Sequence, residues 1–385
     1  MRYQSNGAFS FSVQPIPLQI CHPKKHFVFV KVHKCSSSTV AGVLRKYALE
    51  NNLTIALPSS QITGPNLGWP VSVLPKYIYR YGIMKKRGIA LETVFHHHHF
   101  NLKTWRSVMP RDTVYLAVMR EPLDQLRSAM GFISALKRRI NGTDQRKVGT
   151  FNENRMIKLL SVLSPRQRCQ IYNFYANPKA NHFWLNRKNT VFSWTKNFMA
   201  FSLGFSQKAG MAAAKKYLQH IDGVFDLVIL TEYFMESMLL LRRRMCWSMR
   251  DVTFIRLNSK VTKTVEYPEE LYNKSRAWNT VDHLFYDHFK RKLLQDISKE
   301  NNFQDELERF KEVNEYVNRF CDGVLKKNGV KFIIVPASYW NDEFRFSEGD
   351  CESLVKQNGN TRSELRTYLD SIIDAPKFDF ETKQK

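Results

Sequence analysis

The chain lacks several patterns that would assign a protein quickly to a class. Its six cysteines lie far apart in the 385 residues and form no C-x-x-C pair, which argues against a zinc ribbon or a thioredoxin-like redox site. Its apolar runs, such as Phe27–Val30, fall far short of the roughly 20 residues that a membrane-spanning helix needs. Pro15 and Pro17 interrupt the apolar stretch near the N-terminus, so no signal-peptide core is present. We therefore expect either a cytosolic protein or a chain that lacks its native N-terminal anchor.

Acidic residues are scarce relative to basic ones. The chain has 59 Lys and Arg but 35 Asp and Glu, and its formal net charge is +24 at pH 7. This excess favours anionic partners, such as a nucleic acid, an anionic membrane, or a phosphorylated or sulfated small molecule. The basic residues are spread out, with short clusters such as Lys85–Arg87 and Arg242–Arg244, and no zinc-finger, RRM or homeodomain pattern occurs. No nucleic-acid partner is therefore expected.

Apolar, β-prone runs alternate with amphipathic segments along the chain. This alternation favours an α/β fold with a central parallel sheet flanked by helices. Strands are predicted at Phe27–Val32, Thr113–Val118, Phe225–Leu230 and Val252–Leu257. Helices are predicted at Thr39–Leu49, Leu123–Leu136, Met235–Trp247, Arg276–Ile297 and Glu306–Lys326.

The segment "KVHKCSSST", Lys31–Thr39, lies between the first predicted strand and the first predicted helix. Unpaired N–H groups and the helix dipole make a helix N-terminus a binding site for anions. Lys34 supplies positive charge, and hydroxyls that could donate to an anion or cap the helix belong to Ser36, Ser37, Ser38 and Thr39. The Walker pattern G-x-x-x-x-G-K-[ST] is not met, because no glycine precedes Lys34. The segment therefore predicts either an anion-binding loop or a Ser-rich N-cap.

A second candidate anion site follows the second predicted strand. In "MREPLDQLRSAM", Arg120 ends the strand and Ser128 lies in the next helix, and together they could clamp a phosphate. The alternative is a surface ion pair between Arg120 and Glu121. Because ligands of parallel sheets bind at the carboxyl ends of the strands, Lys34 and Arg120 are expected near one another. Two such sites fit a nucleotide that carries phosphates at two positions.

The patterns K-x-H-K-x-x-S-S-T and R-E-P-x-x-Q-x-x-S resemble those of sulfotransferases that use PAPS, 3′-phosphoadenylyl sulfate. They resemble in particular the galactose-3-O-sulfotransferase family, which includes galactosylceramide sulfotransferase. The resemblance implies a P-loop-like sulfotransferase fold that needs no metal. The likeness continues through Asn197–Phe205, Phe225–Lys260 and Arg276–Phe289.

By this resemblance, PAPS is the co-substrate, and the acceptor is the 3-hydroxyl of a galactose on a glycolipid or glycoprotein glycan. Members of the family are type II membrane proteins whose catalytic domains lie in the Golgi lumen. We predict an irregular lead over residues 1–25, a catalytic domain over 26–300, and a helical C-terminal extension over 301–385 packed on that domain. The residues implied to bind the donor are Lys34, Ser37, Ser38 and Thr39 at the 5′-phosphosulfate, with Ser36 beside them, and Arg120 and Ser128 at the 3′-phosphate.

Four consecutive histidines, His96–His99, precede Phe100. Neighbouring side chains of an extended segment face opposite ways, so at most two of them could share a metal, and no metal site is predicted. A histidine run without a function is an alternative. Related sugar sulfotransferases carry the pattern His-x-x-Phe/Tyr, which His97 matches, so His97 is predicted to be the base that deprotonates the acceptor hydroxyl. His96 is the second choice, and His33 is a further imidazole within reach of the site.

Lys34 and the helix N–H groups are predicted to stabilise the charge that grows on the leaving phosphate oxygen. Glu232 and Glu236 could orient the sugar or His97, or could be ordinary first-turn acids of a helix. Three other functions remain open. They are transfer to another sugar position, a nucleotide-kinase-like use of the loop for ATP, and non-enzymatic binding of sulfated or phosphorylated glycans. Disulfide pairing and oligomeric state are not predicted, although Cys35 is expected to be a free thiol.

Overall fold

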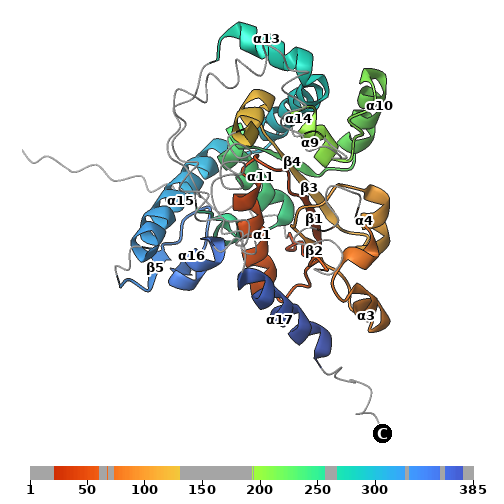
Figure 1. Cartoon of the computed structure of the whole chain (residues 1–385). Coiled ribbons are helices and arrows are strands. Elements are labelled where there is room, and N and C mark those ends of the chain that lie inside the picture. The colour runs from red at the N-terminus through yellow and green to blue at the C-terminus, as the bar shows by residue number, and fades with distance from the viewer. Residues whose placement is uncertain are drawn as a thin grey trace, which may run out of the picture.

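The protein, represented by a computed structural model, is built around one sheet of four parallel strands (Figure 1). The structure describes residues 21–59, 67, 73–130, 193, 195–255, 267–325, 329–355 and 360–375. The strand order is β2-β1-β3-β4, with Phe27 opposite Val114 and Leu116 opposite Leu227. The strands are β1 (Phe27–Val30), β2 (Thr93–Val94), β3 (Val114–Met119) and β4 (Leu227–Leu230).

Helices cover this sheet, and every residue of its four strands is buried. Burial on both faces explains why the sequence has continuous apolar runs here rather than an alternating pattern. The predicted α/β fold with a central parallel sheet flanked by helices is confirmed, and α11 and α14 pack against β4. The helices are α1 (Ser37–Glu50), η1 (Pro75–Tyr77), α3 (Tyr81–Lys86), α4 (Leu102–Val108), a helix over 122–130, α9 (Phe198–Ser202), α10 (Met211–Asp222), η3 (Thr231–Tyr233), α11 (Phe234–Met245), α12 (Met249–Val252), α13 (Glu269–Trp278), α14 (Thr280–Ser298), α15 (Phe303–Leu325), α16 (Glu348–Val355) and α17 (Asn360–Asp374).

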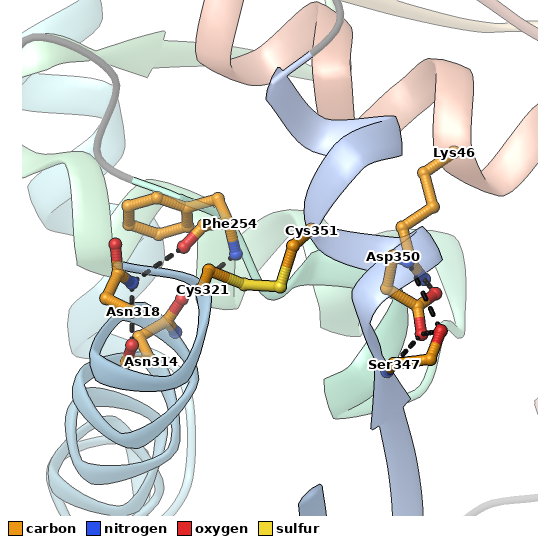
Figure 2. The surroundings of a disulfide bond; sticks show 8 residues. All are labelled: Lys46, Phe254, Asn314, Asn318, Cys321, Ser347, Asp350 and Cys351. Carbon is orange, nitrogen blue, oxygen red and sulfur yellow. Dashed lines mark hydrogen bonds and ion pairs between the residues drawn. A yellow bond between two sulfur atoms is a disulfide. The ribbon is translucent and has the colours of Figure 1, made fainter. Parts of the chain in front are cut away.

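The strand predicted at Val252–Leu257 is wrong over its described part. A capping box at Ser248 begins helix α12, which ends at Val252, and residues 253–255 are irregular. Two side chains of α15 bind the backbone of Phe254 in place of a neighbouring strand (Figure 2). The Phe254 N–H donates to Asn314 Oδ1 at 3.0 Å, and its carbonyl accepts from Asn318 Nδ2 at 2.9 Å. Residues 256 and 257 lie outside the described residues.

The helix predicted at Arg276–Ile297 is two helices, α13 and α14, which meet at Asn279. The helix is interrupted there because a residue from another segment caps the N-terminus of α14. Asn197 Oδ1 accepts hydrogen bonds from the N–H groups of Val281 and Asp282, at 3.1 and 3.3 Å. A side chain distant in the sequence therefore decides where α14 begins.

Helices α9 and α14 cap each other. The Asp282 carboxylate accepts from the N–H groups of Met199 and Ala200 at the start of α9, at 3.2 and 2.8 Å. Asn279 Oδ1 accepts from the Asn197 N–H at 2.8 Å. The sequence segments Asn197–Phe205 and Arg276–Phe289, which carry part of the family resemblance, thus form one interlocked unit.

The C-terminal part is not helical throughout. Besides α15, α16 and α17 it contains an antiparallel hairpin of β5 (Phe332–Val335) and β6 (Phe344–Ser347). Helix α15 packs on α11, and α16 packs on α1 (Figure 1). The division of the chain at residue 300 stays a prediction. No helix among the described residues is long and apolar enough to span a membrane.

Two disulfides join distant segments. Cys21 pairs with Cys246 at the end of α11, and Cys321 of α15 pairs with Cys351 of α16. Cys35 is a buried free thiol, as predicted. The basic cluster Arg242–Arg244 is not a surface for an anionic partner, because each arginine forms an ion pair within the protein; the acids are Glu306, Glu300 and Asp296.

Candidate active site

The loop between β1 and α1 has an unusual backbone. Lys34 and Ser36 have positive φ angles of 67° and 54°, in the left-handed region that side chains other than glycine rarely adopt. Ser36 is the N-cap residue of α1, but its side chain makes no capping hydrogen bond. The Ser-rich N-cap is therefore not what this segment forms. Ser36 is followed by Ser37, Ser38 and Thr39, which form the first turn of α1.

Among these hydroxyl residues, Ser36 is exposed, Ser38 and Thr39 are half-buried, and Ser37 is buried. The Thr39 N–H donates to the Ser36 carbonyl at 3.0 Å, which closes the first turn of α1. Helix α1 has 14 residues, and its dipole gives this N-terminus a partial positive charge. The loop therefore leads into a helix N-terminus, where unpaired N–H groups make an anion site possible.

The end of β3 meets this loop. Arg120 Nη1 donates to the Lys34 carbonyl at 3.5 Å, and Gln125 Nε2 donates to the His33 carbonyl at 3.4 Å. The structure therefore brings Lys34 and Arg120 together, as their places at neighbouring strand ends predict. Ser128 lies half-buried on the helix over 122–130, which follows Arg120.

Glu121 does not serve as the surface partner of Arg120 that was the alternative. Its carboxylate accepts from the Asp124 N–H at 2.8 Å and so caps the following helix. Its own N–H donates to Glu232 Oε1 at 3.0 Å, and Glu232 Oε2 accepts from the Tyr286 hydroxyl at 3.1 Å. Burial raises the pKa of Glu121 to about 7 and also raises the pKa of Glu232. Glu232 thus ties the end of β3 to α14.

His97 lies on the other side of the loop, after β2. Its Nδ1 is 2.8 Å from the Lys31 carbonyl, and because a carbonyl can only accept, Nδ1 carries the proton and donates. Its ring stacks on His33, with 3.6 Å between ring centroids and 4° between planes. Burial lowers the pKa of His97 well below its usual value, and the positive charge of Lys31 and any proton on His33 act in the same direction. The neutral ring therefore keeps an acceptor lone pair on Nε2, as a general base requires.

His33 is neutral for similar reasons. Burial, together with the charges of Lys31 and Lys34, lowers the pKa of His33 to about 3. Its ring therefore acts as a flat, uncharged surface against which His97 packs. The sequence identified His33 and Lys31 as neighbours of the site but did not show that both contact His97.

The other three histidines of the run have different ring contacts, and the His96 ring stacks on Phe95 with 5.1 Å between centroids. His98 is buried edge-to-face against Trp105, and its Nδ1 donates to the His96 carbonyl at 2.9 Å. The His99 ring packs near Phe201, with 4.6 Å between centroids. Among the described residues, no group of three or more His, Cys, Asp or Glu side chains is arranged to hold a metal ion.

Glu232 and Trp278 both have structural contacts. Glu232 follows β4 while His97 follows β2, at opposite edges of the four-stranded sheet, so Glu232 does not orient His97. Trp278 Nε1 donates to the Thr195 carbonyl at 2.7 Å, and Lys196 Nζ lies 4.7 Å from the Trp278 ring centroid. Trp278 therefore helps to hold the segment before α9. Gln125, which contacts the loop, was not singled out from the sequence, although it is part of the R-E-P-x-x-Q pattern.

The fold and this site define a class, that of α/β proteins whose candidate ligand site lies at the carboxyl ends of parallel strands. A family profile described as galactose-3-O-sulfotransferase matches residues 4–147 and 162–331. Human galactose-3-O-sulfotransferase 2 is 28% identical over 316 residues, which are 80% of this chain and 71% of the relative. Mouse galactosylceramide sulfotransferase is 24% identical over 307 residues, which are 78% of this chain and 65% of the relative.

Mouse galactose-3-O-sulfotransferase 3 is 25% identical over 318 residues, which are 80% of this chain and 66% of the relative. The chain belongs to the galactose-3-O-sulfotransferase family. It is therefore a carbohydrate sulfotransferase, and the predicted resemblance is confirmed.

Proposed function

We propose that the protein transfers a sulfuryl group from PAPS to the 3-hydroxyl of a galactose residue on a glycolipid or glycan. One observation carries the proposal. The loop of Lys34 contacts both the guanidinium of Arg120 and the neutral ring of His97, at the carboxyl ends of the neighbouring strands β3, β1 and β2. A polyanionic donor and an uncharged sugar hydroxyl require this combination of positive charge and a neutral base.

The donor fits the loop in the manner of a P-loop-like sulfotransferase fold. PAPS, when bound, supplies the sulfuryl group. We assign its 5′-phosphosulfate to the N-terminus of α1, where the left-handed Ser36 makes no side-chain cap and hydroxyls surround the N–H groups. We assign its 3′-phosphate to Arg120, which lies beside the loop, and to Ser128 on the next helix. The donor would then lie across the ends of β1 and β3.

His97 acts as the base in this proposal. Its Nδ1–H is held by the Lys31 carbonyl, so Nε2 accepts the proton of the acceptor hydroxyl as the oxygen attacks sulfur. His33 is placed by its carbonyl contact with Gln125 and supports the His97 ring from one face. We assign to His33 the positioning of His97, and to His97 the transfer of the proton.

Lys34 is assigned to the opposite end of the reacting group. The ammonium and the first N–H groups of α1 would stabilise the charge that develops on the leaving phosphate oxygen. As in phosphoryl transfer, positioning and electrostatic stabilisation would supply most of the rate enhancement. Both the positioning and the electrostatic stabilisation are assigned to side chains and backbone N–H groups of the protein itself.

The acceptor and the compartment belong to the same proposal. The relatives are named for galactose and for galactosylceramide, which supports a galactose-terminated glycolipid or glycan as the acceptor. Two disulfides fit an oxidising compartment, and we propose the Golgi lumen, with the protein attached to the membrane as a type II protein. We also propose that residues 26–300 form the catalytic domain, with 301–385 packed on it.

An acceptor assay tests this function. The protein is incubated with PAPS and a panel of β-galactosides, and the position of any new sulfate is mapped. We expect sulfate at the 3-hydroxyl of galactose. Sulfate at another sugar position would support the alternative regiochemistry. Binding of adenosine 3′,5′-bisphosphate without any sulfated product would contradict the proposal, and so would magnesium-dependent phosphate transfer from ATP.

A further inference from the structure

The part of the chain after residue 331 lies outside the family match, yet it is packed against the helix that carries the proposed donor loop. Helix α16 lies along α1, and α17 lies beside the far end of α1 (Figure 1). The Tyr368 hydroxyl of α17 donates to the Leu53 carbonyl at 2.9 Å, just after α1 ends. The C-terminal segment therefore contacts α1 through both α16 and α17.

Helix α16 approaches the backbone of α1 directly. A Cβ atom added at Gly42 would lie 2.9 Å from the Leu354 carbonyl oxygen, a distance that real Cβ atoms essentially never show. Gly42 is four residues after Ser38, which at 1.5 Å per residue places this contact only about 6 Å along α1 from the loop. A shift of α16 toward or away from α1 therefore acts close to the proposed phosphosulfate site.

A buried charge links the two helices. Lys46 of α1 is 1% exposed, and its Nζ lies 2.9 Å from Glu50 Oε2 and 3.7 Å from Asp350 Oδ1 of α16. Arg250 Nη2 joins the same two carboxylates, at 2.8 Å from Glu50 Oε1 and 2.7 Å from Asp350 Oδ1. Such a buried charge keeps its partners in place, because an uncompensated charge inside the protein is costly.

Asp350 is itself held in one orientation. Its Oδ2 accepts from the Ser347 N–H at 2.7 Å and from the Ser347 hydroxyl at 2.8 Å (Figure 2). The nearby positive charges and the Ser347 hydrogen bonds together outweigh burial, so the pKa of Asp350 is lowered and the side chain is a carboxylate. The charged group that meets Lys46 is therefore rigid as well as ionised.

A disulfide bond holds α16 on the side away from α1. Cys351, the residue after Asp350, is joined to Cys321 of α15 (Figure 2). Helix α15 packs on α11, which in turn packs on β4 of the central sheet. The disulfide thus connects α16 to the body of the protein on the side away from α1.

We propose that α16, held by the Cys321–Cys351 disulfide and by Asp350, is a positioning element that sets the place of α1 and thereby the affinity of the site for the sulfuryl donor. The inference rests on the proposed function, because it takes the N-terminus of α1 as the donor site. Asp350 and the disulfide touch neither donor nor acceptor and act through α1. This role belongs to the segment beyond the family match.

The test uses the full chain and two variants, Asp350→Asn and the double variant Cys321→Ser/Cys351→Ser. Calorimetry measures the dissociation constant of adenosine 3′,5′-bisphosphate, and kinetics give KM for PAPS, KM for the galactoside, and kcat. Because a misplacement of about 1 Å can cost about 100-fold, smaller shifts of α1 should raise the bisphosphate dissociation constant and the PAPS KM about tenfold. The galactoside KM should stay unchanged. Gly42→Ala provides the same comparison should either variant fail to fold.

Asp370→Asn is the matched control. It removes an ion pair between Asp370 of α17 and Arg80, the N-cap residue of α3, and leaves α16 untouched. We expect it to lower the melting temperature without changing the bisphosphate dissociation constant. Unchanged affinity in folded α16 variants would overturn the inference, and so would an equal loss in Asp370→Asn. A wild-type protein that does not bind the bisphosphate would overturn the proposed function, and this inference with it.

Discussion

The two ends of α1 are held by different kinds of contact. At its N-terminus, the contacts go to the backbone of the loop, since the carbonyls of Lys31, His33 and Lys34 accept from His97, Gln125 and Arg120. Toward its C-terminus, charged side chains pair with one another around Lys46 and Asp350. Loop side chains should therefore matter more for chemistry than for stability. Buried ion pairs that do not contact α1, such as that of Glu306 with Arg242, should matter more for stability than for chemistry.

The largest effect is expected for His97→Ala. Loss of a general base typically costs about 100- to 10,000-fold in rate, so turnover should fall by that order. Binding of adenosine 3′,5′-bisphosphate should persist, because His97 lies on the β2 side of the loop, away from Arg120. Steady-state kinetics and calorimetry measure the two quantities. His96→Ala is the control; if it abolished turnover and His97→Ala did not, the neighbouring histidine would be the base.

Glu306→Gln should have the largest effect on stability. Glu306 is 1% exposed and pairs with Arg242 and Arg243, so its loss should lower the free energy of unfolding by about 3 kcal/mol. The kcat and the donor KM should change little, since this pair lies at the far end of α11. Chemical denaturation measures the change. The control on the same helix is Glu308→Gln, an exposed pair with Lys311 that should cost less than about 1 kcal/mol; similar losses in both would contradict the prediction.

Lys34→Gly separates chemistry from stability most sharply. It removes a charge from the loop, so the bisphosphate dissociation constant should rise about 10- to 100-fold, as expected for a charged hydrogen bond. The same change relieves a positive φ of 67°, so the melting temperature should not fall. Asn52→Gly, at the other end of α1 with a φ of 54°, should be similarly tolerated and leave binding unchanged. Loss of stability in Lys34→Gly would show that the side chain supports the fold.

The last expected effect is a pH dependence of stability. The folded protein lowers the pKa of His33 to about 3 and that of His97 well below its usual value, while unfolded rings titrate near 6.5. The unfolded state then binds more protons below pH 6.5, so this stabilisation is complete above pH 6.5 and is lost as the pH falls toward 3. Each ring contributes no more than about 1.4 kcal/mol per pH unit. Denaturation of wild type and of His33→Gln/His97→Gln at pH 7, 6 and 5 should give a shallower dependence in the variant; equal slopes would count against the lowered pKa values.

The sheet was the most predictable part of the fold. The runs at Phe27, Thr113 and Phe225 became β1, β3 and β4, because a parallel strand buried on both faces needs an unbroken apolar segment. The run at Val252 is also rich in apolar, β-prone residues but is not a strand, since Asn314 and Asn318 bind the backbone of Phe254. Local composition cannot reveal partners that lie sixty residues away. The two-residue β2 was too short to be detected.

The site was predictable to a similar degree. Lys34 and Arg120 could be paired from their positions at strand ends, and the structure places them together. His97 could be chosen only by family resemblance. Its stack on His33 and its bond to the Lys31 carbonyl depend on how β2 lies against β1. The break at Asn279 likewise depends on a cap from Asn197.

The sequence by itself determined the α/β class and the family, because these depend on hydrophobic periodicity and on short motifs that act locally. Only the tertiary structure decided the tautomer of His97, the ion-pairing of Arg242–Arg244 and the close contact of α16 with Gly42. Each of these depends on the distance between residues far apart in the chain. Packing of the whole core sets such distances, and no local pattern encodes them.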